Sequence, residues 1–273
     1  MRQYTLTLGG VALRCRLRYP ETAAYFDAFA PSGAASPCVE ASEPVSIPDR
    51  DWSEALREGM TDDAHSEFSM LTNYCSDALL RYDRVILHAA ALRWRDGAYL
   101  ICAPSGTGKS TQAGALQALR PGEFGVICGD RPVLEFRLSA PCHSEQSEES
   151  VSSVPFHRHS ERSEESASPV PAPILVHPSP WNGKENWHGA EAAPLAGLIL
   201  LSRGPENRLT ALTDREAALT MYQHFLQSAW VPENIRRVAA LETRLLRAVP
   251  IWLLESDQVP DSTRLLLDAV FPR

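Results

Sequence analysis

The sequence predicts an α/β fold in which a mixed β-sheet surrounds a central strand–loop–helix unit, with flanking helices and a β-rich N-terminal extension. Residues 98–119 carry this unit, because an apolar run leads into a glycine-rich loop and then into a helical pattern. The last third of the chain alternates short apolar runs with amphipathic helices, as α/β proteins do. The 273 residues are 44% hydrophobic and 22% charged, a composition that excludes disorder over the whole chain.

Residues 1–83 predict the extension. Polar and apolar residues alternate on both sides of a Gly-Gly pair in residues 3–19, which is typical of a β-hairpin. Residues 31–48 are rich in Pro, Ser and Ala and predict a surface connection. Residues 62–80 show apolar side chains at helical spacing and predict a helix.

The main domain is predicted at residues 84–273. Its first half contains five apolar runs that predict strands, at 84–92, 98–103, 124–128, 133–138 and 173–177. The last two are expected to face each other across a long intervening segment. Its second half predicts a strand at 194–201, helices at 214–230 and 233–249, a strand at 250–254 and a terminal helix capped by Asp261 or Ser262. The helix at 233–249 is expected to turn one apolar stripe to the core, formed by Ile235, Val238, Leu241 and Leu245.

Residues 141–170 predict a disordered insertion in the main domain. CHSEQSEES at 142–150 is repeated as RHSERSEES at 158–166, and nine of the thirty residues are serine. Such a segment buries too little apolar area to offset its ordering entropy, and at a hairpin tip it disturbs no packed backbone. The functional alternative is a phosphorylatable or metal-binding tract that uses His143, His157 and His159.

The six cysteines form no CxxC pair and no cysteine–histidine cluster, so we expect reduced, buried thiols. The N-terminus has no continuous apolar segment of the secretory type, and no apolar run approaches the length of a membrane span. We therefore expect a cytoplasmic protein without a membrane partner.

The loop APSGTGKST at 103–111 has the spacing of a phosphate-binding P-loop. Glycines let successive backbone N–H groups converge on an anion, and the following helix adds its partial positive charge. Lys109 is expected to reach the β- and γ-phosphates of a nucleotide, and the Ser110 hydroxyl to bind Mg²⁺. Ala103 replaces the first glycine of the motif, a small residue that preserves the tight turn. The predicted nucleotide-binding residues are Ser105, Gly106, Thr107, Gly108, Lys109, Ser110 and Thr111. The alternative is a glycine-rich turn with a solvated lysine.

Two further residues are candidates for the chemistry. Asp130 follows the strand at 124–128, which we expect beside the P-loop strand, where a metal ligand or a catalytic base would sit. The alternative is an ordinary turn residue. His88 lies on the preceding predicted strand, and taken alone it is a core histidine with satisfied hydrogen bonds.

The loop at 178–189 is a second candidate site element. Trp181, Lys184 and Trp187 stand among Pro, Asn and Gly, a composition that we expect to expose them. Lys184 would then contact a phosphate or an anionic acceptor, and the tryptophans would cover a nucleotide or peptide. The alternative is that the tryptophans pack on the sheet edge. Arg131 and Arg203 are additional candidate phosphate contacts, with ordinary surface or ion-pair roles as the alternative.

The segment HAAALRWRDGAYLICAPSGTGKST with the following VICGD resembles the catalytic domain of bacterial HPr kinase/phosphorylase and related P-loop kinases. That family has a histidine upstream of the P-loop lysine, an S-G-x-G-K-S loop and an apolar strand ending in acids. His88, the loop from Ser105 to Ser110, and Asp130 match this pattern. The resemblance covers most of residues 84–270 and implies a phosphoenolpyruvate-carboxykinase-like fold, ATP and Mg²⁺. The segments at 179–189 and 194–204 resemble an uncharacterised subgroup, part of which we associate with peptide-modification gene clusters.

The chain departs from this family at Gly129, where HPr kinases carry the first of two adjacent acids. Lys109, Asp130 and His88 remain as the expected catalytic residues, with Ser110 and Asp130 on the metal. The leading hypothesis is an ATP- and Mg²⁺-dependent kinase that transfers the γ-phosphoryl group to a hydroxyl of a protein, peptide or small molecule. The alternative is a nucleotide-dependent binding or regulatory module with little or no catalysis. A third hypothesis is a small-molecule kinase or carboxykinase-like enzyme, which differs only in the acceptor.

The formal net charge is −8, and half of it lies in residues 141–170, which carry six glutamates and two arginines. The remaining chain is only mildly acidic, so its charge argues weakly against nucleic acid. The phosphate-binding loop, which points to a nucleotide ligand, is the stronger reason to expect no nucleic-acid partner. The family resemblance also allows a homo-oligomer.

Overall fold

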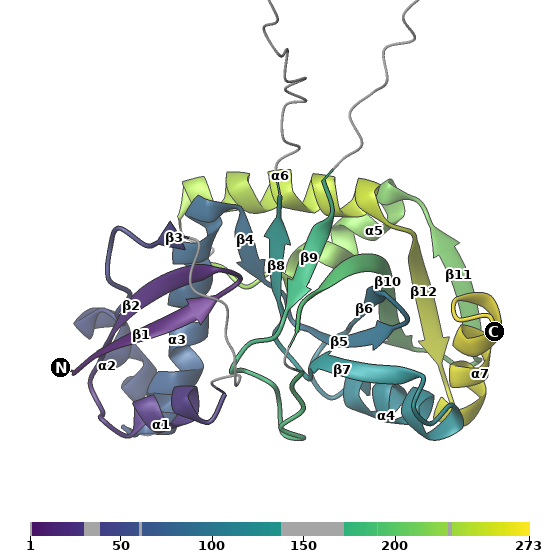
Figure 1. Cartoon of the computed structure of the whole chain (residues 1–273), viewed down its shortest axis with the longest axis horizontal. Coiled ribbons are helices and arrows are strands. Elements are labelled where there is room, and N and C mark those ends of the chain that lie inside the picture. The colour runs from purple at the N-terminus through teal and green to yellow at the C-terminus, as the bar shows by residue number, and fades with distance from the viewer. Residues whose placement is uncertain (1, 30–38, 60–61, 138–171, 190, 229–230) are drawn as a thin grey trace, which may run out of the picture.

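The computed structural model describes residues 2–29, 39–59, 62–137, 172–189, 191–228 and 231–273. These residues form a three-stranded sheet with α1, α2 and α3 at one end and a nine-stranded sheet with further helices at the other (Figure 1). The predicted α/β class is confirmed. The predicted insertion at 141–170 lies outside the described residues.

The N-terminal hairpin is confirmed. β1 (Arg2–Leu8) and β2 (Val11–Leu17) pair antiparallel with Leu8 opposite Val11, so the two glycines between them form the turn. The predicted helix is α3 (Ala64–Leu79), and the Asp63 side chain caps it by accepting a hydrogen bond from the Ser66 N–H.

Three short N-terminal elements were not predicted, because each is too short for a periodic pattern: α1 (Thr22–Asp27), β3 (Val39–Glu40) and α2 (Asp49–Arg57). The surface connection expected at residues 31–48 is wrong for three residues of its described part, 39–48. Ala41, Val45 and Ile47 are buried against the hairpin and α3.

The large sheet has the order β4-β8-β9-β10-β6-β5-β7, with β12 on β10 and β11 on β12. β10 runs parallel to β6 and β12, and the other pairs are antiparallel, so the sheet is mixed as predicted. The P-loop strand β6 lies inside the sheet, between β10 and β5. The strands are β4 (Arg84–Ile86), β5 (Ala89–Trp94), β6 (Gly97–Cys102), β7 (Phe124–Cys128), β8 (Val133–Phe136), β9 (Ile174–His177), β10 (Ala193–Arg203), β11 (Arg208–Leu212) and β12 (Ile251–Ser256).

Two strand predictions are wrong. The run at 84–92 is not one strand, because the chain breaks at Leu87 and His88: β4 pairs with β8, whereas β5 pairs with β6 and β7. β7 is also not next to the P-loop strand, since β5 lies between them. β8 and β9 do face each other as predicted, from Val133 opposite His177 to Phe136 opposite Ile174.

Four longer helices accompany the large sheet: α4 (Lys109–Leu119), α5 (Asp214–Met221), α6 (Pro232–Ala248) and α7 (Val259–Ala269). The predicted helix at 214–230 is wrong beyond Met221, because the chain passes through a 3₁₀ turn, η2 (Tyr222–His224), into an extended segment whose Phe225 bridges to Leu87. α7 begins earlier than predicted, with Gln258 as its N-cap and Asp261 in its first turn. Ile235 on α6 is 38% exposed and does not join the buried stripe.

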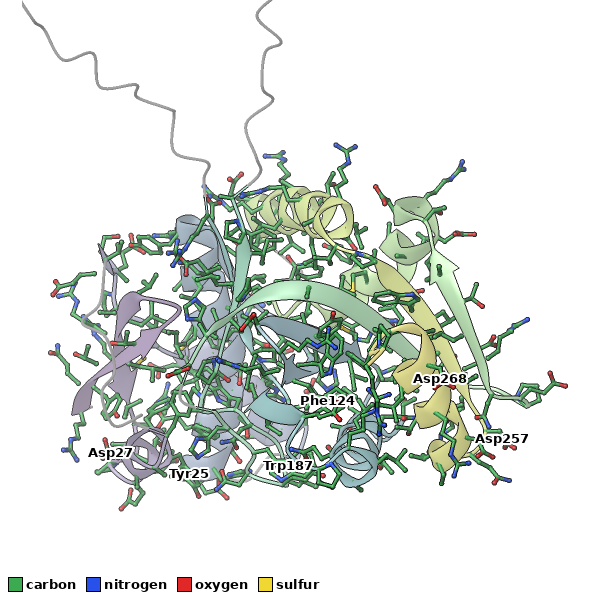
Figure 2. The ribbon with its side chains drawn as sticks, turned by 45° about the vertical axis from the view of Figure 1, so that its right-hand side comes forward. Tyr25, Asp27, Phe124, Trp187, Asp257 and Asp268 are labelled. Carbon is green, nitrogen blue, oxygen red and sulfur yellow. The ribbon has the colours of Figure 1, made fainter. Side chains whose placement is uncertain are left out.

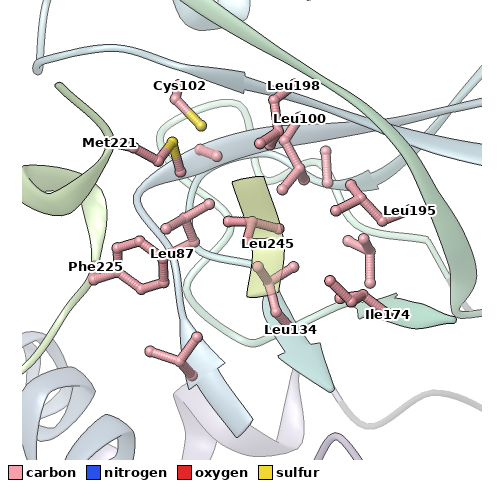
Figure 3. Packing of buried hydrophobic residues seen from close by; sticks show 14 of the residues in the cluster. Leu87, Leu100, Cys102, Leu134, Ile174, Leu195, Leu198, Met221, Phe225 and Leu245 are labelled. Atoms are coloured by element: carbon pink, nitrogen blue, oxygen red, sulfur yellow. The ribbon is translucent and has the colours of Figure 1, made fainter. Parts of the chain in front are cut away.

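Helices cover both faces of the large sheet, which explains its nearly continuous apolar runs. On one face Leu100, Leu134 and Leu198 pack with Met221, Phe225 and Leu245 (Figure 3). On the other face Ala90, Leu92 and Ile101 pack with residues of α4 and α7. The apolar side chains of β5 and β6 therefore alternate between two separate apolar clusters.

The N-terminal elements pack on the large sheet. Their buried residues form one apolar cluster with Ile86 of β4, Val133 of β8 and Trp181. The domain boundary at residue 84 stays a prediction.

Four described cysteines are free and buried, namely Cys15, Cys75, Cys102 and Cys128, in agreement with the expected reduced thiols. Cys38 and Cys142 lie outside the described residues. Within the described ranges, no helix is long and apolar enough to cross a membrane.

Candidate functional site

The glycine-rich loop joins the end of β6 to the start of α4. Gly106 and Gly108 have φ angles of 76° and 118°, a region that favours glycine, and Gly108 directly precedes the helix. The Thr107 N–H donates to the Pro104 carbonyl oxygen at 3.3 Å and closes the turn. The loop thus brings its backbone to a helix N-terminus, which is suited to an anion.

Lys109 begins α4 and is 8% exposed. Its Nζ lies 2.8 Å from His88 Nε2 and 3.8 Å from Asp130 Oδ1, and it donates to the Ala103 carbonyl oxygen at 3.2 Å. Burial lowers the pKa of Lys109, although the charge of Asp130 opposes this change. The amino group is therefore held inside the loop beside one histidine and one carboxylate.

Antiparallel pairing explains why His88, Lys109 and Asp130 meet. β5 runs antiparallel to both β6 and β7, so its beginning lies between the ends of those two strands. His88 stands directly before β5, while the loop with Lys109 follows β6 and Asp130 follows β7. The Ala89 N–H also donates to the Asp130 carbonyl oxygen at 2.8 Å.

Asp130 is surrounded by positively charged or ionisable groups. Oδ1 lies 3.2 Å from His88 Nε2, and Oδ2 lies 3.3 Å from Arg131 Nε. Burial acts to raise the pKa of Asp130, but the hydrogen bond from His88 and the charges of His88, Arg131 and Lys109 outweigh it and lower the pKa. The carboxylate is held ionised at the centre of the site.

His224 is a further residue near the site that the sequence analysis missed. Its carbonyl oxygen accepts a hydrogen bond from the His88 N–H at 2.7 Å, and the two ring centroids lie 6.3 Å apart. The side chain is 2% exposed, and burial, with the charges of His88 and Lys109, lowers its pKa to about 4. The predicted long helix at 214–230 hid this residue, because its position would have been an ordinary helical one.

The expected exposure of Trp181 is wrong. It is 4% exposed, its Nε1 donates to the Phe68 carbonyl oxygen at 2.8 Å, and its ring packs against Phe26 and Phe68. Trp187 is partly buried beside α4, where a Cβ on Gly114 would be 3.5 Å from its ring (Figure 2). Lys184 is exposed, as expected.

The loop at 178–189 follows β9 and packs against the residues at the end of β7, close to Asp130. The Gly129 N–H donates to the Trp187 carbonyl oxygen at 2.8 Å. A Cβ on Gly129 would come closer than 3.0 Å to the Asn182 carbonyl oxygen, and a Cβ on Gly183 would be 3.3 Å from Asp130 Cβ. The loop backbone therefore occupies the space that an acidic side chain at position 129 would need.

The two candidate arginines differ in their contacts. The Arg203 guanidinium is exposed and donates to the Gly106 carbonyl oxygen at 2.9 Å, so it touches the outside of the loop. Arg131 contacts Asp130 and reaches across to α3, where Nη1 donates to Thr72 Oγ1 at 2.9 Å. Arg131 therefore lies beside the central carboxylate, whereas Arg203 contacts only the loop backbone in these interactions. Of the other loop residues, Ser105 and Thr111 are exposed, and Thr107 and Ser110 are half-buried.

The donor set suits magnesium better than a closed transition-metal site. The described part of the chain holds no group of three or more His, Cys, Asp or Glu side chains arranged to hold a metal ion. Magnesium usually takes one or two carboxylates together with substrate phosphates and water. Asp130 offers one carboxylate beside Lys109, and Ser110 lies in the first turn of α4, so the residues supply oxygen donors of the type that magnesium uses.

No protein-family model matches the chain, and no curated protein matches it. Among solved structures, the chain is similar to the HPr(Ser) kinase/phosphatase from Coxiella burnetii, with 11% sequence identity and a TM-score of 0.33. The match covers 68% of this chain and 87% of that chain. This is a weak and distant similarity in fold.

Proposed function

We propose that this protein binds ATP with Mg²⁺ at the loop of residues 103–111 and transfers the γ-phosphoryl group to a hydroxyl of a protein, peptide or small molecule. The convergence of Lys109, His88 and Asp130 at the N-terminus of α4 is the observation that supports the proposal most directly. A solvated lysine in a structural turn would not be buried between an imidazole and a carboxylate.

Each residue has a role in this proposal. The loop backbone and Lys109 bind the β- and γ-phosphates, and Ser110 and Asp130 hold the metal. Bound Mg²⁺ neutralises charge on the phosphates and orients them. In the transfer, the acceptor oxygen forms a bond to the γ-phosphorus as the bond to the leaving diphosphate breaks. His88, in the neutral form with Nε2 unprotonated, takes the hydroxyl proton at Nε2, and Asp130 Oδ1 at 3.2 Å then accepts a hydrogen bond from the resulting imidazolium.

A nucleotide-dependent binding module is the second candidate function, and one observation favours it. The Asn182 carbonyl oxygen lies where a side chain at position 129 would be, so an acid that takes the acceptor proton has no room there. In this alternative the protein binds the nucleotide without transferring a phosphoryl group, and the loop at 178–189 responds to the bound nucleotide. His88 is then a binding residue.

The test is titration of the full chain with ATP and Mg²⁺, compared with Lys109→Ala. We expect Lys109→Ala to weaken binding at least tenfold, since about 1.4 kcal/mol corresponds to a factor of ten and charge-assisted hydrogen bonds contribute about that or more. Equal affinity in the two proteins would exclude the nucleotide site. Labelled ATP with candidate acceptors then separates the two functions, because tight binding without turnover supports the module.

A further inference from the structure

Arg131 occupies a position that the proposed reaction has not used. It directly follows Asp130, and its side chain is 31% exposed, so it is accessible from the site. Nε lies 3.3 Å from Asp130 Oδ2, and Nη1 donates to Thr72 Oγ1 at 2.9 Å. The guanidinium therefore spans from the central carboxylate to α3.

The contact with α3 holds the guanidinium in place. Thr72 is 1% exposed, and its hydroxyl donates to the Ser69 carbonyl oxygen at 2.8 Å. Because the Thr72 hydroxyl already donates its hydrogen bond to Ser69, its oxygen acts as the acceptor for Arg131. A guanidinium fixed at one nitrogen loses less freedom when its other donors bind a ligand.

The donors of Arg131 are not fully used by the protein. Its buried Nε makes no hydrogen bond to any described residue, although it lies near Asp130. Nε is itself shielded from solvent against Asp130, so a ligand would meet the terminal nitrogens of the side chain, and a phosphate oxygen is an acceptor suited to them.

The charges at the site also favour an anion. One carboxylate, that of Asp130, faces two cations, Lys109 and Arg131, as well as His88. A phosphoryl group would compensate the excess positive charge.

We propose that Arg131 is a catalytic residue that binds the terminal phosphoryl group of a nucleoside triphosphate and distinguishes triphosphate from diphosphate. The proposal rests on the proposed nucleotide site and adds a residue to it. Asp130 separates the two cations, with Oδ1 toward Lys109 and Oδ2 toward Arg131. Lys109 and the loop backbone bind the β- and γ-phosphates, and Arg131 contacts the γ-phosphate from the other side of the carboxylate, where charge develops during transfer.

The experiment measures the affinity of the full chain for ATP and for ADP, each with Mg²⁺. Arg131→Gln is expected to weaken ATP binding about tenfold and to change ADP binding less than about twofold, the size expected for loss of a charge-assisted contact to one phosphate. Arg203→Gln is the matched control, because that arginine touches the loop backbone at Gly106 and should change both affinities equally. Equal losses for ATP and ADP in Arg131→Gln, or no loss, would overturn the proposal.

A second measurement uses the unaltered protein, so it does not depend on the folding of a variant. Phenylglyoxal modifies accessible arginines, and mass spectrometry reports the modification of Arg131 separately. ATP with Mg²⁺ should protect Arg131 at least several-fold better than ADP with Mg²⁺. Equal protection contradicts the assignment even if both nucleotides bind. If the unaltered protein binds neither nucleotide, the proposed function itself has failed.

Discussion

The backbone carbonyl oxygen of Asn182 lies against Gly129 so closely that a Cβ at position 129 would be within 3.0 Å of it. Gly129 is the position at which the resemblance to HPr kinases leads one to expect an acid. The position of the loop at 178–189 therefore depends on the absence of a side chain at position 129, and a side chain added there must displace the loop.

Gly129→Ala should destabilise the protein by about 1–3 kcal/mol, because the added methyl group meets backbone atoms that cannot turn away. Chemical denaturation measures the loss. Gly125→Ala on β7, four residues earlier, is the control, since a Cβ there would be 3.7 Å from its nearest neighbour, Arg93 Cβ, an ordinary contact. Similar stability of the two variants would show that the loop moves freely away from Gly129.

The chain contains two lysines, Lys109 and Lys184, which permits a direct chemical test of the nucleotide site. An acyl-phosphate derivative of ATP transfers its acyl group to an amine beside the phosphates. We expect modification of Lys109, whose lowered pKa leaves more of the amine neutral, and protection by unmodified ATP. Peptide mass spectrometry identifies the modified residue. Modification of Lys184 alone would place the phosphates at the loop of residues 178–189 and contradict the proposed site at residues 103–111.

Glu242 predicts a pH dependence of stability. It is 8% exposed on α6, its Oε1 has no hydrogen-bond partner among the described residues, and burial raises its pKa from 4.5 to about 7. The folded state then holds a proton that the unfolded state has released, so wild-type stability falls as pH rises from about 4.5 through 7.

Glu242→Gln removes this penalty. We expect the variant to exceed wild type by about 1–3 kcal/mol at pH 8 and to approach it near pH 4.5. Urea denaturation at several pH values measures the difference. His224, whose lowered pKa of about 4 takes stability away as pH falls below 6.5, is present in both proteins and cancels. A stability difference that does not change with pH would contradict the assignment.

Deletion of residues 142–168 should leave the melting temperature and the ATP affinity nearly unchanged. β8 and β9 pair with each other up to Phe136 opposite Ile174, so the residues that remain are enough to join them. Thermal unfolding and ATP titration of the shortened chain check this expectation. A large loss in either quantity would show that the serine-rich repeat contributes to the fold or to the site.

The sequence predicted which candidate residues lie close together better than it predicted how the strands bring them together. The P-loop spacing predicted Lys109 and its neighbours, because that motif requires particular residues at particular positions. Asp130 was predicted to lie near Lys109 because its strand, β7, was expected beside β6. The two residues do lie close together, but β5 lies between β6 and β7. Strand order depends on long-range pairing, which local apolar patterns do not specify.

Burial in irregular segments was the least predictable property. Trp181 was expected to be exposed because it is flanked by Pro and Asn, but Phe26 and Phe68 from the N-terminal elements cover its ring. His224 was hidden in an apparent amphipathic helix that ends earlier because Phe225 bridges to Leu87. Both outcomes depend on residues far away in the sequence.

The link between Thr72 and Arg131 bears on how the protein can be divided for experiment. A fragment that begins at residue 84 would keep the phosphate loop, Asp130 and His88, but would lose the hydroxyl that holds Arg131. It would also leave Trp181, Ile86 and Val133 without their apolar partners. Recombinant work on the proposed nucleotide site therefore needs the N-terminal region, because that region supplies the hydroxyl that holds Arg131.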